Sequence, residues 1–408
     1  MSTAKCRFCM TPLATTFVDL GMGPLVSSYL REDQLDCMEP FFPLHAYVCG
    51  NCFLVQLRES ASPETLFGDY PYFSSVSESW LRHAKTYVDC MIDRFGFGAE
   101  SHVVEIASND GYLLQYFRER GVPVLGVEPA RNVAAAAQEG GIPTVVEFFG
   151  TATARDLAGR RKADLLLGNN VLAHVPDLND FVGGLKTLLA PDGVITMEFP
   201  HLMRLMLENQ FDTIFHEHFS YLSFSTVGRV FEKHGLQFFD VEELPTHGGS
   251  LRIYACHTEK PRTPSERVQE LRNREDAAGL NSLDGYGAFS DQAVRTKHTL
   301  LEFMIRLRRE GHTIAGYGAP GKGCILLNYV GIGSDFLDYT VDRSPHKQGL
   351  YMPGVHIPIH DPSKISETRP DYILILPWNL KDEIMDQMAH IRDWGGQFIV
   401  PIPEVKIY

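Results

Sequence analysis

The stretch VVEIASNDGYLL at residues 103–114 decides the fold class of this chain. Its first half is a β-branched run that ends near Glu105, and its second half turns through Asn109, Asp110 and Gly111 into a helix. Glycine and asparagine permit the tight turn by which a buried strand passes directly into a helix. The stretch lacks G-x-G-x-x-G and therefore the glycines that cradle a dinucleotide pyrophosphate. We expect it to open a doubly wound α/β sheet.

Strand-like and helix-like runs alternate on both sides of this stretch, over residues 76–258. The expected parallel strands are HVVEIAS, VPVLGVE, ADLLLGN and GVITMEF. LQFFDVEEL and SLRIYACH follow, joined by a short glycine-containing link, and read as an antiparallel pair. A parallel sheet closed by an antiparallel hairpin is typical of Rossmann-like methyltransferases. We therefore predict such a domain over residues 76–258.

Polar residues follow the ends of these expected strands. Glu128 stands at the tip of the second strand, where an acid can accept hydrogen bonds from both ribose hydroxyls of an adenosyl ligand. Singly, Glu128 could be a surface acid and Asn170 a turn residue, but their order along the sheet predicts S-adenosylmethionine binding. The residues expected to bind this cofactor are Glu105, Ala107, Asn109, Gly111, Tyr112, Glu128, Pro129, Asn169 and Asn170.

Four of the eight cysteines form two C-x-x-C pairs, C-R-F-C and C-G-N-C, separated by 39 residues. Two such knuckles can present four thiolates to one zinc ion, and four protein ligands leave no open position for catalysis. A redox pair is the alternative, which the spacing disfavours. We predict a structural zinc site at Cys6, Cys9, Cys49 and Cys52, within a zinc-binding module spanning residues 1–75.

Bulk composition limits the class of partner. The formal net charge is −14 and the pI about 5.6, which disfavours nucleic acid or an anionic membrane as a partner. The sequence has no run of 18 apolar residues and opens with a polar stretch, so we expect a cytoplasmic protein. We also expect it to act as a monomer. Residues 259–312 read as a helical connector, and residues 313–408 as a smaller C-terminal Rossmann-like α/β domain.

That last domain contains GYGAPGKG at residues 316–323, with Asp342 at the end of the next expected strand. The pattern superficially fits a nicotinamide-dinucleotide fingerprint with its ribose acid, so a dehydrogenase is one alternative. Pro320 and Lys322 change the loop, and Lys322 beside glycine-rich backbone suits an anionic pyrophosphate. Arg343 is a further candidate for phosphate contact.

The segment FDTIFHEHFSYLS at residues 211–223 places two histidines around an acid in an aromatic stretch. Its position after the fifth strand lies at the open end of the cofactor site, where an acceptor must bind. Metal binding is the first interpretation, but the segment lacks the H-E-x-x-H spacing of helical zinc sites. A structural loop held by hydrogen bonds is the second. A general base is the third, because carbon methylation requires removal of a proton made acidic by a neighbouring ketone.

The cysteine pairs together with EIASNDGYLL, FHEHFSYLS and GYGAPGKG resemble the nucleotide-sugar C-methyltransferases of deoxysugar biosynthesis, of the tetronitrose and kijanose type. The resemblance covers essentially the whole chain. It implies methyl transfer from S-adenosylmethionine to C-3' of a dTDP-linked 4-keto deoxysugar, such as a 3-amino-2,3,6-trideoxy-4-keto hexose. It also implies that the last domain helps to hold the nucleotide sugar.

The resemblance implies catalytic roles for His218 as the base, Glu217 as its support, and His174 and Tyr72 as groups that hold the sugar. Residues expected to contact the substrate are Tyr70, Phe215, Tyr221, Lys322 and Arg343. A tyrosine commonly precedes H-E-H in that family, whereas this chain has Phe215. Methylation of oxygen or nitrogen in another metabolite, and a zinc-stabilised binding module without catalysis, are the alternatives.

Overall fold

The computed structural model describes residues 4–59, 62–68, 70 and 72–408. Contacts group the chain into two compact units, each assembled from three segments. Unit 1 comprises Met1–Ala14, Cys49–Leu202 and Glu217–Ser282, and unit 2 comprises Thr15–Val48, Met203–His216 and Leu283–Tyr408. The domain boundaries expected after residues 75, 258 and 312 divide the chain consecutively, whereas the compact units interleave.

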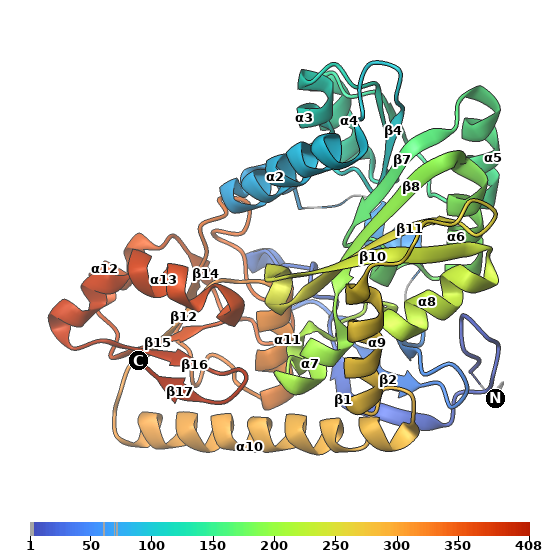
Figure 1. Ribbon diagram of the computed structural model, residues 1–408. Coiled ribbons are helices and arrows are strands. Elements are labelled where there is room, and N and C mark those ends of the chain that lie inside the picture. Colours follow the sequence, from blue (N-terminus) through green and yellow to red (C-terminus); the bar gives the residue numbers. More distant parts are fainter. Residues whose placement is uncertain (1–3, 60–61, 69, 71) are drawn as a thin grey trace. The chain divides into compact units, whose positions relative to one another are not determined.

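Unit 1 is built on a mixed sheet (Figure 1). Within the described residues its strand order is β10-β11-β8-β7-β4-β5-β6. The strands are β4 (Val103–Ile106), β5 (Val124–Val127), β6 (Thr144–Val145), β7 (Ala163–Asn169), β8 (Leu189–Pro200), β10 (Leu236–Leu244) and β11 (Ser250–His257). β11 is antiparallel to both β8 and β10, while the remaining neighbours are parallel. The α/β fold with a closing antiparallel hairpin is confirmed.

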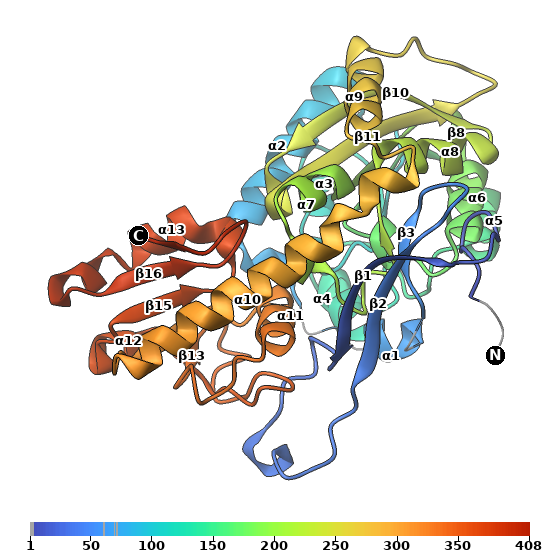
Figure 2. The same ribbon diagram turned by 90° about the horizontal axis from the view of Figure 1, so that it is seen from below.

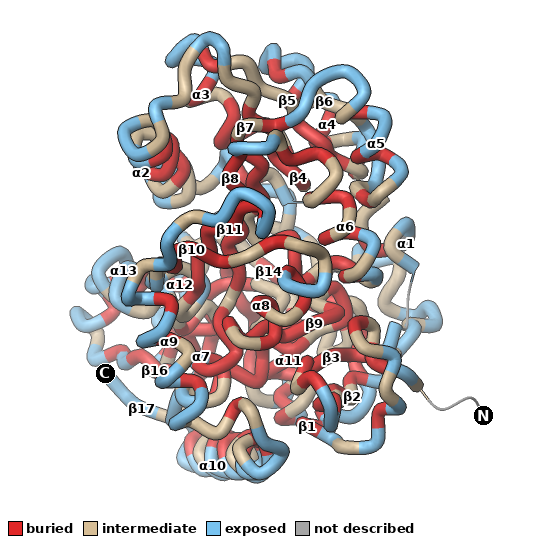
Figure 3. Tube along the Cα trace, turned by 45° about the vertical axis from the view of Figure 1, so that its right-hand side comes forward, coloured by how far each residue is buried: buried red, intermediate tan, exposed pale blue. Residues whose placement is uncertain are grey.

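The central parallel strands of this sheet are mostly apolar and largely buried, as expected where helices cover both faces. β7 carries three consecutive leucines, Leu165, Leu166 and Leu167, all fully buried, and β4 is buried throughout. Figure 3 shows β4, β7 and β8 as largely buried trace. The register pairs Ile106 with Val127, so the loops after β4 and β5 leave the same edge.

The helices of unit 1 are α1 (Pro63–Phe67), α2 (Glu78–Phe95), α3 (Leu114–Glu119), α4 (Arg131–Glu139), α5 (Thr151–Arg160), α6 (Leu178–Leu188), α8 (Phe224–Lys233) and α9 (Glu266–Ala277). The longest, α2, buries Ala84, Tyr87, Val88 and Met91, an i, i+3, i+4, i+7 stripe that faces the sheet. Its N-cap Ser77 accepts a hydrogen bond from Trp80, and the left-handed Gly96 ends it. The N-cap fixes where α2 begins, and this start lies next to the cofactor loop.

A short antiparallel pair in unit 1 joins the cysteine-rich segment to the H-E-H segment. β3 (Val55–Leu57) pairs with β9 (Ser220–Tyr221), and Val55 lies opposite Tyr221. The Leu57 backbone N–H also donates to the Phe219 carbonyl. The residues that follow His218 are therefore held by a strand that begins three residues after Cys52.

Unit 2 contains a parallel sheet with an antiparallel edge strand. Within the described part of the chain its order is β14-β13-β12-β15-β16-β17. The strands are β12 (Ile314–Tyr317), β13 (Thr340–Val341), β14 (Ile359–His360), β15 (Tyr372–Ile375), β16 (Gln397–Val400) and β17 (Lys406–Ile407). The helices are α10 (Ala288–Arg309), α11 (Gly321–Val330), α12 (Ser363–Thr368) and α13 (Lys381–Gln387), and α7 (Leu202–Leu207) begins at the unit boundary.

Unit 2 also takes in an antiparallel hairpin from the N-terminal region, formed by β1 (Thr15–Gly23) and β2 (Phe42–Val48). Its buried Phe17 stacks on Phe289 of α10, with ring centroids 4.6 Å apart, and meets Tyr286 edge-on at 6.1 Å. Figure 2 shows the hairpin beside the start of α10. Burial of this apolar face explains why the hairpin is grouped with unit 2. No helix among the described residues is both long and apolar enough to cross a membrane.

Candidate functional site

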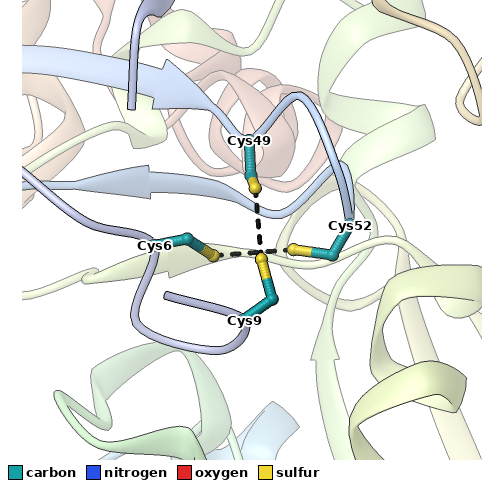
Figure 4. A group of neighbouring side chains, drawn as sticks. All are labelled: Cys6, Cys9, Cys49 and Cys52. Carbon is teal, nitrogen blue, oxygen red and sulfur yellow. Dashed lines mark hydrogen bonds between the residues drawn. The ribbon is translucent and has the colours of Figure 1, made fainter. Parts of the chain in front are cut away.

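The four predicted zinc ligands converge in unit 1 (Figure 4). Their sulfur atoms all lie within 4.8 Å of one another, with Cys6–Cys52 at 3.5 Å and Cys9–Cys49 at 3.4 Å. A zinc ion with Zn–S bonds of about 2.3 Å needs tetrahedral sulfurs about 3.8 Å apart, so this set fits the metal. The hydrogen bond between Cys6 and Cys52 lowers the pKa of Cys6 and raises that of Cys52, so the pair readily holds one thiolate.

The two knuckles share one backbone geometry. Met10 and Phe53, each following a second cysteine, adopt left-handed φ angles of 64° and 60°. Their backbone N–H groups donate to the carbonyls of Cys6 and Cys49, both at 3.0 Å. This repeated turn aims two sulfur atoms from each knuckle at a single point. A cysteine cluster of this kind is a structural metal centre because its four sulfurs complete the coordination.

The predicted cofactor loop follows β4 and contains three residues in left-handed conformations, Ala107, Asn109 and Gly111. A side chain at Gly111 would approach Ile142 to 2.8 Å, so glycine is required there by space as well as by φ. Asn109 is one of the residue types that tolerate this region. The sequence GYLL then leads into α3.

Acidic groups surround this loop in unit 1. Glu128 accepts the backbone N–H of Asn109 at 2.9 Å and that of Ala130 at 2.8 Å, as expected at a strand tip. Glu105 is fully buried, and neither carboxylate oxygen has a hydrogen-bond partner among the described residues. Burial, followed by the charges of Asp110 and Glu128, raises the pKa of Glu105 well above its ordinary value. Pro129 directly follows Glu128.

The end of β7 supplies the remaining predicted cofactor residues. Asn169 donates to the hydroxyl of the buried Tyr112 at 3.4 Å, and Asn170 lies 3.1 Å from His247. The Asn170 side-chain oxygen is buried and has no partner among the described residues. Such unpaired acceptors, beside the acids of the neighbouring loop, fit a cationic ligand with hydroxyl and ammonium donors, as S-adenosylmethionine has.

A cluster of aromatic and imidazole rings in unit 1 contains most of the predicted catalytic residues. The His218 and His174 rings lie 4.7 Å apart and edge-on, and Tyr221 is 6.2 Å from His218. Phe67 packs on His174 at 5.4 Å. Tyr70 lies 6.5 Å from Tyr72, which is 50% exposed. The structure thus brings His218, His174, Tyr221 and Tyr70 together from three separate segments of the chain.

Glu217 connects this cluster. Its side chain forms a hydrogen bond with Tyr70, and its backbone carbonyl accepts one from the His174 ring. Burial, followed by the Glu217 charge, raises the pKa of Tyr70 well above its ordinary value. Burial lowers the pKa of His174 to about 4, so the His174 imidazole is neutral at physiological pH. Among the residues predicted in the H-E-H segment, Phe215 belongs to unit 2, because the unit boundary falls between His216 and Glu217.

The predicted phosphate-binding residues of unit 2 have other contacts. Lys322 donates to Asn379 at 2.9 Å and lies 4.5 Å from the Trp378 ring centre, near the buried Asp212. Burial raises the pKa of Asp212 to about 7. Arg343 is 70% exposed and lies 4.0 Å from Glu383.

The glycine-rich loop of unit 2 is also partly capped from within. The Ala319 backbone N–H donates to Asp342 at 2.8 Å, while Lys347 donates to the Ala319 carbonyl. Asp342 thus occupies the position of the fingerprint acid and already binds a loop amide that an anionic ligand would otherwise use.

Sequence reasoning missed several residues at the edge of the unit 1 site. Trp80 stacks on His83, with centroids 4.8 Å apart, and on Tyr112 at 6.0 Å. His83 in turn pairs with the fully buried Glu198 at 2.9 Å. His247, next to Asn170, has a left-handed φ of 55°. An aromatic residue in the first turn of a helix after a polar linker was the one available signal, and it is weak.

Comparison with known proteins gives this site a family. Residues 6–67 match the family "Putative zinc binding domain", residues 80–241 match "Methyltransferase domain", and residues 245–403 match "C-methyltransferase C-terminal domain". C-methyltransferase NovU of Streptomyces niveus is 37% identical over 404 residues, covering 99% of this chain and 96% of that protein. The chain belongs to this family of C-methyltransferases, and it is an enzyme that uses S-adenosylmethionine as its methyl donor and carries a zinc-binding cysteine cluster.

More distant proteins match smaller parts of the chain. Ubiquinone biosynthesis O-methyltransferase of Rhodopseudomonas palustris is 27% identical over 96 residues, covering 23% of this chain and 38% of that protein. A solved structure of magnesium protoporphyrin IX methyltransferase from Synechocystis with bound S-adenosylmethionine covers 47% of this chain and 86% of that one, at 14% identity and a TM-score of 0.34. C-methyltransferase NovU, by contrast, matches nearly the whole length of this chain.

Proposed function

We propose that this enzyme methylates C-3' of a dTDP-linked 4-keto deoxysugar, with His218 as the general base. The observation that supports this most directly is the ring cluster in unit 1. In this cluster the His218 imidazole lies beside the neutral His174. The adjacent residue Glu217 is buried and hydrogen-bonded to Tyr70. Carbon methylation by the whole-length relative requires such a base, whereas methylation of an oxygen or nitrogen lone pair does not remove a C–H proton.

The chemistry requires a carbon nucleophile. A ketone at C-4' makes the neighbouring C-3' proton acidic, and a neutral imidazole at His218 takes that proton as the C–H bond breaks. The electron pair moves into the enolate, whose negative charge rests on the C-4' oxygen. S-adenosylmethionine supplies an electrophilic methyl group on its sulfonium. The proton stays on His218 until it is lost to solvent, and Glu217 stabilises the imidazolium electrostatically.

The C-4' oxygen needs a hydrogen-bond donor as its charge develops. Phe215 has no hydroxyl to offer, so we assign this role to a tyrosine of the ring cluster, Tyr72 or Tyr221. Tyr72 is half exposed on a segment that borders the cofactor loop. His174 and Tyr70 hold the sugar, and Lys322 and Arg343 of unit 2 are assigned to the nucleotide.

The sugar is proposed to carry a 3-amino group, as a 3-amino-2,3,6-trideoxy-4-keto hexose does. We further place the enzyme in the cytoplasm, in keeping with eight cysteines of which none forms a disulfide. We also propose that it works as a monomer, for which the solution mass would be 45.8 kDa.

Proton exchange in D2O tests the base without requiring methyl transfer. The enzyme with S-adenosylhomocysteine is incubated with candidate dTDP-4-keto sugars, and deuterium at C-3' is followed by NMR. His218→Asn should slow the enzyme-dependent exchange by about a hundredfold or more, the usual loss of a general base. The matched control is His102→Asn, at the opposite end of β4 from the cofactor loop, which should exchange like the wild type. Undiminished exchange in His218→Asn would remove His218 from the mechanism.

A further inference from the structure

One asparagine of the cofactor loop holds the chain segment that carries Tyr72. The Asn109 side-chain oxygen accepts the backbone N–H of Ser74 at 2.9 Å, and its side-chain nitrogen donates to the Tyr72 carbonyl at 3.0 Å. Asp110 accepts the next backbone N–H, that of Ser75, at 3.1 Å. Side chains of the loop thus bind the backbone of residues 72–75 much as a neighbouring strand would.

The contacts of Asn109 use the whole side chain. It is 7% exposed, and both its oxygen and its nitrogen are bonded to the 72–75 segment. Its backbone N–H separately donates to Glu128, the acid proposed to bind ribose. Asn109 therefore contacts the cofactor side of the site through its backbone and the acceptor side through its side chain.

The residue type fits this double role. A left-handed φ of 49° is tolerated by asparagine, aspartate and glycine. Only asparagine of these three has both a donor and an acceptor in its side chain. Aspartate would keep the bond from Ser74 and face the Tyr72 carbonyl with a second oxygen, and glycine would keep the turn while removing both bonds.

The segment held in this way borders the ring cluster. Tyr72 lies 6.5 Å from Tyr70, which is bonded to Glu217. Asn132 of α4 binds both the N–H and the carbonyl of Tyr70, at 3.1 and 2.7 Å. Both tyrosines are thus fixed through their backbones by asparagine side chains, Tyr72 by Asn109 and Tyr70 by Asn132.

We propose that Asn109 is a positioning residue that fixes residues 72–75 on the cofactor loop, so that a properly formed loop sets the place of Tyr72 in the acceptor site. This inference rests on the proposed function, in which Tyr72 contacts the sugar. The Asn109 side chain is thereby assigned to positioning of the acceptor site, whereas the sequence pattern predicted that Asn109 binds the cofactor alone.

The test uses the full-length zinc-loaded enzyme and the variants Asn109→Gly and Asn109→Asp. Hydrogen exchange of the Ser74 and Ser75 amides is measured with S-adenosylhomocysteine bound. Loss of two side-chain hydrogen bonds in Asn109→Gly should speed exchange of these amides by about tenfold. In steady-state kinetics, the KM for the nucleotide sugar should rise more than the KM for S-adenosylmethionine, and Asn109→Asp should give a smaller rise.

The control is Asn179→Ala. Like Asn109, Asn179 binds two backbone groups through its side chain, in this case the carbonyls of Arg7 and Phe8. The control variant should leave exchange at Ser74 and the ratio of the two KM values unchanged. Unchanged exchange in Asn109→Gly, or a larger rise in the cofactor KM than in the sugar KM, would overturn the proposal. If the wild type accepted no nucleotide sugar, the proposed function would fail, and the exchange measurement would still decide whether Asn109 holds this segment.

Discussion

At the scale of single residues, the site depends on groups whose protonation is set by burial. His174 is the clearest case, because its ring packs between Phe67 and His218 and donates to a backbone carbonyl. A histidine in such surroundings is neutral and keeps one tautomer. It can orient a neighbour without competing with it for a proton, which suits the proposed role of His218 as the base.

The neutral state of His174 predicts a pH-dependent stability. Its pKa is about 4 in the folded chain and about 6.5 in the unfolded chain. As the pH falls below 6.5, the unfolded state binds a proton that the folded state refuses, so stability decreases until about pH 4. In His174→Phe this contribution is absent, and thermal unfolding should show a smaller fall in Tm between pH 7 and pH 5. A fall as steep as that of the wild type would contradict the assignment.

Individual residues also show where sequence reasoning succeeds and where it stops. The cysteine ligands could be predicted because C-x-x-C spacing acts locally. The position of Glu128 at a strand end could be predicted from the strand pattern, while its contact with the cofactor stays a prediction. The side-chain contacts of Asn109 could not be predicted, since they depend on which distant backbone the loop meets. The contacts of Lys322 with Asn379 and Trp378, from the loop after β15, depend on a distant segment in the same way, and its expected contact with a phosphate stays a prediction.

At the scale of elements, a buried acid on α9 fixes the start of α8. Glu275 is fully buried and accepts the backbone N–H groups of Phe224 and Ser225, at 2.7 and 2.8 Å. It also pairs with the buried His201 at 2.7 Å. Burial alone would raise the pKa of Glu275, but the bonds with His201 and Ser225 hold it below its ordinary value. The helix that follows the H-E-H segment is thus capped twice: its N-cap Ser223 accepts the Thr226 N–H, and an acid of another helix binds its first two amides.

Glu275→Ala should therefore destabilise the protein by about 3 kcal/mol, because it leaves two helix amides and His201 without their partner. Denaturant unfolding followed by circular dichroism measures the change. Glu270→Ala, an exposed acid on the same helix, should change stability by less than about 0.5 kcal/mol. Equal effects of the two substitutions would show that the cap contributes nothing beyond helix propensity.

The elements themselves were largely predictable. ADLLLGN, LQFFDVEEL and SLRIYACH coincide with β7, β10 and β11, because long β-branched or apolar runs bounded by polar residues have few other solutions. Short strands such as β6, β14 and β17 were not identified, since two residues carry too little pattern. The function of α9 was also missed: its sequence is polar, and the buried Glu275 looks like any exposed acid.

At the scale of the whole molecule, the main departure from sequence order is the interleaving of the two units. Periodicity reports which face of an element is apolar, but not which distant element covers it. The sequence pattern therefore did not indicate that Phe17 of the β1–β2 hairpin packs on α10 within unit 2. The same limit applies to the H-E-H segment, whose residues are divided between units after His216.

The zinc cluster is expected to act on the methyltransferase part of unit 1 through direct contacts. The Cys52 carbonyl accepts hydrogen bonds from Thr226 and Arg229 of α8, both at 3.1 Å. Removing the metal should loosen both knuckles and, with them, α8 and the β3–β9 pair. We expect chelation to lower the Tm of the full chain by about 10 °C and to reduce methyl transfer, since structural zinc contributes directly to folding free energy.

The same loss should follow from Cys49→Ser, whereas Cys37→Ser, an exposed cysteine outside the cluster, should leave both Tm and activity near wild type. Zinc added back after chelation should restore Tm and activity together, because the cluster supports β9 and α8 rather than the chemical step. If activity disappeared on chelation while the Tm stayed constant, the metal would have to act at the reacting atoms. Four sulfur ligands from the protein argue against that, because they complete the tetrahedral coordination and leave no position for substrate or water.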